Sequence, residues 1–86
     1  MNTNNISVIK PEYVINAARQ ATGGMYGMRV MRAERGERGW RLKYVALDDS
    51  YPIAAIERSL TREVGETVRM IDLHYDFDTA SRLVCA

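Results

Sequence analysis

The stretch Val68-Arg69-Met70-Ile71-Asp72-Leu73-His74-Tyr75-Asp76-Phe77-Asp78 alternates apolar and polar residues more regularly than any other part of the chain. Successive side chains of a β-strand point to opposite faces of its sheet. The alternation therefore predicts a strand over residues 66–77 with a buried apolar row of Ile71, Leu73, Tyr75 and Phe77. The other row predicts an exposed acidic face made of Asp72, His74, Asp76 and Asp78.

Two segments before this strand have the spacing of amphipathic helices. The first is predicted over residues 11–22, because Pro11 suits the first helical position and small apolar residues then recur at helical spacing. The second carries Ile53, Ile56, Leu60 and Val64 at spacings of three and four. Gly65 is expected to end this helix, and Asp48-Asp49-Ser50 offers oxygens that could cap its start.

Residues 25–35 and 40–47 flank the turn-like sequence Gly36-Glu37-Arg38-Gly39 and predict a β-hairpin. A two-residue turn would place Glu34 opposite Arg41, Ala33 opposite Leu42 and Met31 opposite Tyr44. One face of the hairpin would then be apolar, with Met31, Ala33, Trp40, Leu42 and Tyr44. The other face would carry Arg32, Glu34, Arg41 and Lys43, and farther from the turn it would become apolar through Tyr26, Met28, Val30, Val45 and Leu47.

The predicted element order is (β)αββαβ, which indicates an α+β fold. We expect a two-layer sandwich in which an antiparallel sheet carries two helices on one face. If Ile6–Ile9 forms a first strand, this order is that of the ferredoxin-like fold. The length predicts a single domain over residues 1–86, with residues 1–5 disordered and a tail over 79–86 that forms either a short helix or an edge strand.

The net charge of +1 conceals a strong asymmetry along the chain. Residues 1–47 carry eight basic and three acidic side chains, whereas residues 48–86 carry four basic and eight acidic ones. Such a chain could pair with a second copy of itself. The absence of an apolar run near 18 residues argues against a membrane span, and the single cysteine with a polar start predicts a cytoplasmic protein.

The sequence shows no set of residues typical of an enzyme. Cys85 is next to the C-terminus, where a nucleophile is hard to hold in place, and no glycine pattern fits a phosphate loop. A metal-dependent enzyme using Asp72, His74 and Asp76 is a third-ranked hypothesis. Alternate side chains on one strand lie about 7 Å apart and cannot easily converge on one ion. We therefore expect no catalytic residues, no metal and no cofactor.

The leading hypothesis is a small non-enzymatic module that binds another protein as an accessory factor or inhibitor and that could be a homodimer. An apolar centre beside arginines is typical of protein interfaces. The candidate binding residues are Tyr26, Met28, Val30, Arg32, Arg35, Arg38, Arg41, Lys43 and Val45. The alternative is nucleic-acid binding through the hairpin over residues 25–47, where basic and aromatic side chains are interleaved.

Overall fold

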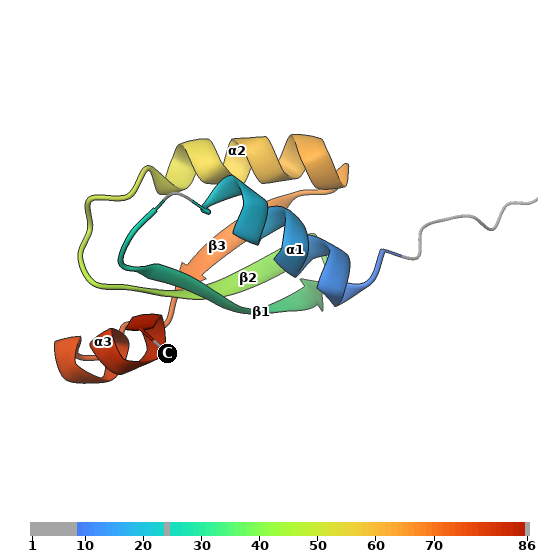
Figure 1. The fold of residues 1–86 in the computed structure, drawn as a ribbon. Coiled ribbons are helices and arrows are strands. Elements are labelled where there is room, and N and C mark those ends of the chain that lie inside the picture. Colours follow the sequence, from blue (N-terminus) through green and yellow to red (C-terminus); the bar gives the residue numbers. More distant parts are fainter. Residues whose placement is uncertain (1–8, 24, 86) are drawn as a thin grey trace, which may run out of the picture.

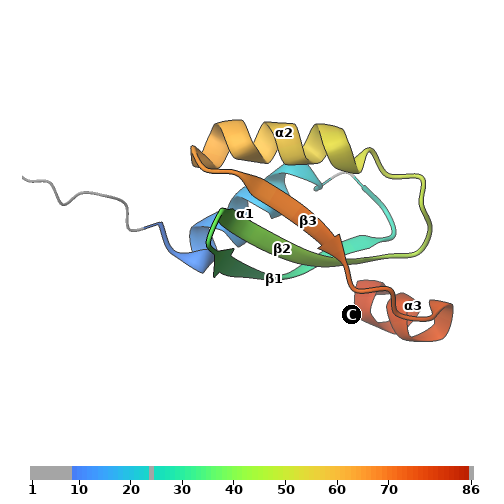
Figure 2. The same ribbon diagram turned by 180° about the vertical axis from the view of Figure 1, so that it is seen from behind.

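The structure, a computed structural model, describes residues 9–23 and 25–85, and it contains three helices and three strands within them (Figure 1). In chain order these are α1 (Pro11–Ala21), β1 (Met28–Gly36), β2 (Gly39–Ala46), α2 (Ile53–Val64), β3 (Val68–Asp72) and α3 (Phe77–Cys85). The α+β class is confirmed. The sheet order is β1-β2-β3, with β1 antiparallel and β3 parallel to β2 (Figure 2). The expectation of an entirely antiparallel sheet is therefore wrong.

The direct parallel pairing of β2 with β3 does not confirm the ferredoxin-like order. That order separates the two parallel strands of a βαβ unit by a further strand, whereas β2 and β3 pair from Trp40 with Val68 to Tyr44 with Asp72. The predicted first strand, Ile6–Ile9, lies outside the described residues except for Ile9, which packs against the core. The predicted disorder of residues 1–5 also concerns residues outside the described part.

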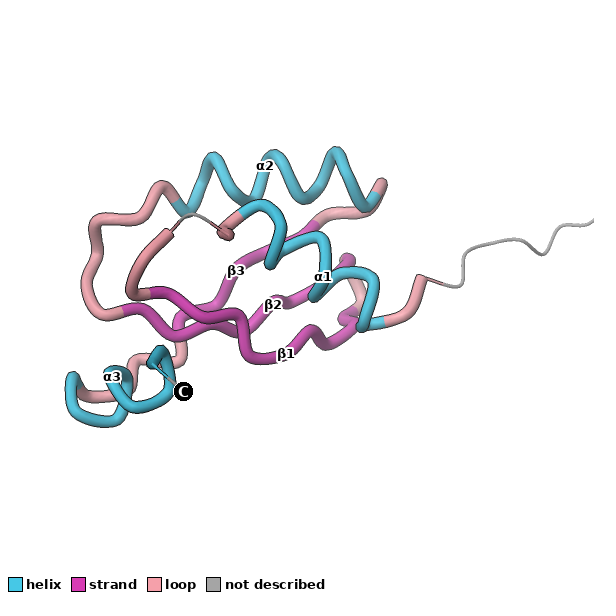
Figure 3. The backbone as a smooth tube through the Cα atoms, viewed as in Figure 1, coloured by secondary structure: helices cyan, strands magenta, loops and turns pink. Residues whose placement is uncertain are grey.

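Both predicted amphipathic helices form, and they pack over the same face of the sheet (Figure 3). Pro11 is at the start of α1, and Gly65 ends α2 in the left-handed conformation with its N–H donated to the Thr61 carbonyl. The expected cap at the start of α2 is absent, because Pro52 precedes the helix without a side-chain hydrogen bond. Asp48 instead accepts hydrogen bonds from the Ser50 N–H and hydroxyl within the preceding loop.

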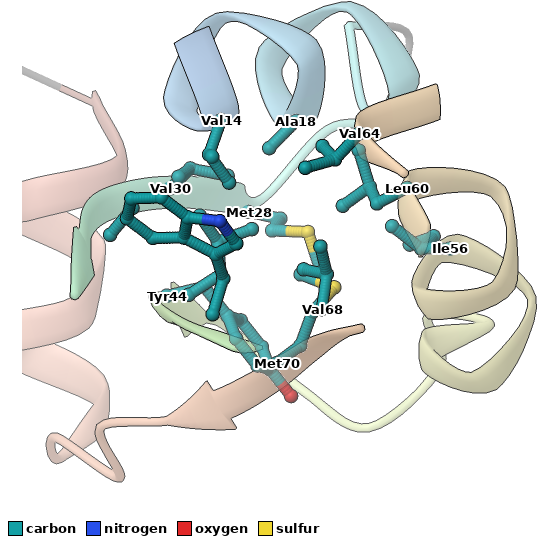
Figure 4. Close-up of a cluster of buried hydrophobic side chains, with 13 residues drawn as sticks. Val14, Ala18, Met28, Val30, Tyr44, Ile56, Leu60, Val64, Val68 and Met70 are labelled. Atoms are coloured by element: carbon teal, nitrogen blue, oxygen red, sulfur yellow. The ribbon is translucent and has the colours of Figure 1, made fainter. Parts of the chain in front are cut away.

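The hydrophobic core lies between these helices and the inner face of the sheet (Figure 4). Its largest fully buried side chains come from α1, α2, β2 and β3. They are Val14 in α1, Leu60 in α2, Trp40 and Leu42 in β2, and Val68 in β3. A fully buried residue of this size stabilises the fold by about 1.5–3 kcal/mol. This core fixes which side of β2 and β3 faces the helices.

The hairpin has the predicted turn, with Gly36 paired to Gly39, Glu34 to Arg41 and Ala33 to Leu42. A β-bulge between Val30 and Arg32 then shifts the register, so that Val30 rather than Met31 lies opposite Tyr44. Because the bulge adds one residue, the β1 side chains before it point to the opposite face of the sheet from the one predicted. Met28 and Val30 therefore join the core, with exposed fractions of 9% and 2%. The expectation that they line an open apolar face is wrong for this reason.

The stretch over residues 68–78 differs most from its prediction. β3 ends at Asp72, and its buried residues are Val68 and Met70. The predicted core row is wrong: Ile71 points to the other face of the sheet and is 38% exposed, while Tyr75 and Phe77 are 47% and 65% exposed beyond the strand. The parallel register between β2 and β3 decides which side chains of β3 are buried, because Met70 lies opposite Leu42, which is in the core.

Side chains of α2 occupy the outer edge of β3. The Val68 N–H donates to Thr61 Oγ1 at 3.0 Å, and the Met70 N–H donates to Glu57 Oε2 at 2.8 Å. A bare strand edge is a template for pairing with another chain. These two bonds satisfy donors that a further strand would need, so the edge of β3 is closed to strand addition.

The tail forms α3, one of its two predicted alternatives, and this helix lies on the side of the sheet away from α1 and α2 (Figures 1 and 2). Ala80 of α3 and Val45 of β2 are both buried there, outside the main core. Arg29 Nη1 donates to the Leu83 carbonyl at 2.8 Å, near the C-terminal end of the helix. Such a contact is favourable because the end of a helix carries partial negative charge. None of the helices in the described part is long and apolar enough to cross a bilayer.

Two glycines with positive φ provide a test of the fold. At Gly39 (φ 128°) an added Cβ would collide with the backbone carbonyl of Thr67, whereas at Gly65 (φ 86°) it would meet nothing within 4 Å. We expect Gly65→Ala to lower the free energy of unfolding by about 1 kcal/mol, the cost of a left-handed alanine. Gly39→Ala should cost more than about 2 kcal/mol, since it also forces β2 and the start of β3 apart. Urea unfolding of both variants measures the difference, and equal losses would contradict the close approach at Gly39.

Candidate protein-binding surfaces

One side of the sheet is covered by α1 and α2, and the other side is open except where α3 lies on it (Figure 2). Side chains alternate along each strand, so the residues between the core positions point to this open side. We call the exposed part the arginine face. Its residues are Arg32 and Glu34 of β1, Arg41 and Lys43 of β2, and Arg69 and Ile71 of β3.

The single carboxylate of the arginine face, that of Glu34, is already paired. Arg32 Nε lies 2.8 Å from Glu34 Oε2, and Lys43 Nζ lies 3.4 Å from Glu34 Oε1. The hydrogen bonds from Arg32 and Lys43 lower the pKa of Glu34. In the described part of the chain, Arg41 and Arg69 have no ion-pair partner. They are neighbours on adjacent strands, so their positive charges reinforce each other.

The hairpin end of this face is hollowed into an open groove of about 1050 Å³. It is lined by residues 35–41 and by Thr67, Arg69 and Ile71. Four arginines and one glutamate are among these residues, so the groove is strongly basic. Gly36 leaves room for the Arg41 guanidinium, whose Nη1 lies 3.2 Å from the position that a Cβ would take.

The rim of the groove is held in place by a small network. The Trp40 indole N–H donates to Glu66 Oε1 at 3.0 Å, and Arg35 Nη2 lies 3.0 Å from the same oxygen. The Arg35 guanidinium also lies over the Trp40 ring, 4.6 Å from its centre. A cation over an aromatic face is attracted by the ring quadrupole. Arg35 is thus oriented by two contacts, with the Glu66 carboxylate and with the Trp40 ring, whereas Arg38 in the turn has no ion-pair partner among residues 9–23 and 25–85.

The candidate binding residues predicted from the sequence fall into three groups. The charged ones come together: Arg32, Arg41 and Lys43 lie on the arginine face, and Arg35 and Arg38 line the groove. The apolar ones do not join them, since Val45 is covered by α3 and two others lie in the core: Met28 and Val30. Tyr26 is 92% exposed and precedes β1 at the end of the hairpin away from the turn.

A second exposed surface follows β3. We call residues 72–78 the aromatic–acidic turn. The Asp72 side chain accepts a hydrogen bond from the His74 N–H at 2.8 Å, and His74 has a left-handed backbone (φ 57°) that ends the strand. The Asp76 side chain accepts from the Thr79 N–H at 2.8 Å and so caps α3. This bond lowers the pKa of Asp76.

These two hydrogen bonds shape the aromatic–acidic turn, which exposes two aromatic side chains, Tyr75 and Phe77. Rigid aromatic anchors lose little conformational freedom on binding and dominate many interfaces. The turn therefore has the features of a preformed contact surface with negative charge around it.

The predicted acidic row does not exist as one face. Asp72 is half-buried at the end of β3, and His74 is exposed in the turn, with its imidazole Nδ1 3.9 Å from Asp72 Oδ2. Asp76 and Asp78 belong to the start of α3. Within residues 9–23 and 25–85, no three His, Cys, Asp or Glu side chains are placed to hold a metal ion.

Sequence reasoning missed Arg69 and Ile71 as surface residues and Tyr75 and Phe77 as exposed aromatics. The signal for the first pair was present: Val68 and Met70 are also apolar and alternate with them, so the strand could be read in either phase. The signal for the second pair was the series of aspartates, which cap turns and helices more often than they continue strands.

The chain was compared with protein-family models, curated proteins and solved structures, and none of the three comparisons found a match.

The cap at Asp76 can be tested by two substitutions. Asp76→Ala should destabilise α3 by about 1 kcal/mol, whereas Asp76→Asn should cost only a few tenths, because asparagine also caps helices. The lowered pKa means that the advantage over alanine is present at neutral pH and is lost as the pH falls through that pKa. Amide hydrogen exchange at Ala80, measured against pH, reports this. Equal protection in the alanine and asparagine variants would contradict the cap.

Proposed function

We propose that the chain is a small non-enzymatic protein-binding module whose arginine face docks onto an acidic surface of a protein partner, as an accessory factor or inhibitor would. The observation that carries this is the pair Arg41 and Arg69, which are exposed and without ion-pair partners in the described part of the chain, beside the half-exposed Ile71. An apolar centre with arginines around it is the composition of a protein interface core. We place this activity in a reducing compartment, the cytoplasm, because the chain has a single cysteine.

The burial of the hairpin aromatics favours a protein over a nucleic acid. Single-stranded nucleic acids need exposed rings on which their bases stack, but Trp40 and Tyr44 are 2% and 6% exposed. Trp40 lines the groove and is covered by Arg35. The sequence pI of about 7.9 is also below the range typical of nucleic-acid-binding domains. Nucleic-acid binding through the hairpin remains the second hypothesis, supported by the arginines alone.

The proposal predicts that partner binding depends on the sign of charge at the arginine face. We expect Arg41→Glu/Arg69→Glu to weaken binding roughly tenfold or more, because each substitution replaces attraction with repulsion at an acidic partner. The matched control is Arg58→Glu/Arg62→Glu, which makes the same charge change at exposed positions of α2 and should leave binding unchanged. Circular dichroism and thermal unfolding of both variants establish that they are folded.

Partners are captured on immobilised protein from cells of the source organism, and the captured protein is then purified and titrated directly. A partner that binds the wild type and the α2 control, but not the arginine-face variant, supports the proposal. Retention by all three would contradict it. Capture that is abolished by nuclease treatment would instead favour the nucleic-acid hypothesis.

A further inference from the structure

We infer that the arginine face and its groove receive the aromatic–acidic turn of a second copy of this chain, in a two-fold symmetric dimer. This inference rests on the proposed function and names the partner surface. It follows from three observations: the chemistry of the two surfaces, their places at opposite ends of one side of the sheet, and the two hydrogen bonds that shape the turn.

The two surfaces are complementary in charge and in the chemistry of their side chains. Four arginines line the groove together with one glutamate, Glu37. The turn carries Asp76 and Asp78 on either side of Phe77, which is 65% exposed. Guanidinium groups bind carboxylates and also stack on aromatic rings. The chain already makes the second kind of contact internally, between Arg35 and the Trp40 ring at 4.6 Å.

The places of the two surfaces allow both contacts to form at once. The groove lies at the hairpin end of the open side of the sheet. The helix α3 covers the other end of the same side (Figures 1 and 2). The aromatic–acidic turn connects the end of β3 to this helix. Two copies stacked face to face, with their strands running in opposite directions, would bring each turn over the hairpin end of the other copy, where the groove lies. The contact is then isologous and closes as a dimer.

The occupant is a second copy because the chain itself supplies the missing half of the surface. The basic and acidic ends nearly cancel, leaving a net charge of +1. Stacking copies in this way brings opposite charges together at both contacts. It also covers Ile71, Tyr75 and Phe77, the largest exposed apolar side chains on or beside this side of the sheet. A domain of this size buries a limited core of its own, so it gains comparatively much from such burial.

The experiment uses a charge-swapped pair of variants and the wild-type chain. Variant one is Arg41→Glu/Arg69→Glu, which makes the groove acidic. Variant two is Asp76→Asn/Asp78→Lys, which removes the net negative charge of the turn while asparagine keeps the cap of α3. Sedimentation at micromolar concentrations and low ionic strength gives the mass of each chain alone and of an equimolar mixture, and circular dichroism checks that each is folded.

We expect a dimer for the wild type, self-association at least roughly tenfold weaker for each variant alone, and a dimer again for the mixture, in which the unchanged basic groove of variant two meets the unchanged acidic turn of variant one. Phe77→Ala should weaken the wild-type dimer, and Tyr26→Ala, at a still more exposed position outside both surfaces, should not. A monomeric wild type, dimers that persist in both variants, or a mixture that stays monomeric would each overturn the inference. A monomeric wild type that still captures another protein through Arg41 and Arg69 would overturn the second-copy partner and leave the proposed function standing.

Discussion

The structure depends on the position of β2 in the middle of the sheet, where its side chains alternate between two very different environments. Trp40, Leu42 and Tyr44 enter the core, and Arg41 and Lys43 point to the open side. Because β2 pairs with both neighbours, its phase sets the phase of β1 and β3. Moving β2 by one residue would bury two positive charges and expose the tryptophan, which is a cost of several kcal/mol. The arginine face is therefore a direct consequence of how the core is packed.

Local signals in the sequence were sufficient for the helices and the hairpin turn. Pro11, Gly65 and the apolar spacing of α2 act within a few residues, and the two-residue turn at Glu37-Arg38 fixes the pairing of Glu34 with Arg41. These features do not need a partner element to be recognised. The α+β class followed from them.

Features set by tertiary contacts were not predictable. The bulge after Val30 has no marker in the sequence, yet it decides that β1 contributes Val30 to the core. The phase of β3 was ambiguous, and its pairing with Leu42 of β2 resolved it in favour of Met70. The hairpin turn set the register near it, so Arg41 was predicted on the charged face. The other phase was assigned to β3, so Arg69 was missed.

We propose that the open side of the sheet is the surface on which another protein chain docks, and that this chain is a second copy. The single, exposed Cys85 at the end of α3 permits a direct measurement. A nitroxide attached there is mixed with an isotope-labelled, unmodified copy, and relaxation enhancement is recorded at the labelled amides. The account predicts broadening at Arg41, Arg69 and Ile71 of the labelled copy. Broadening that is absent, or that falls on the exposed side of α2 at Arg58 and Arg62, would contradict it.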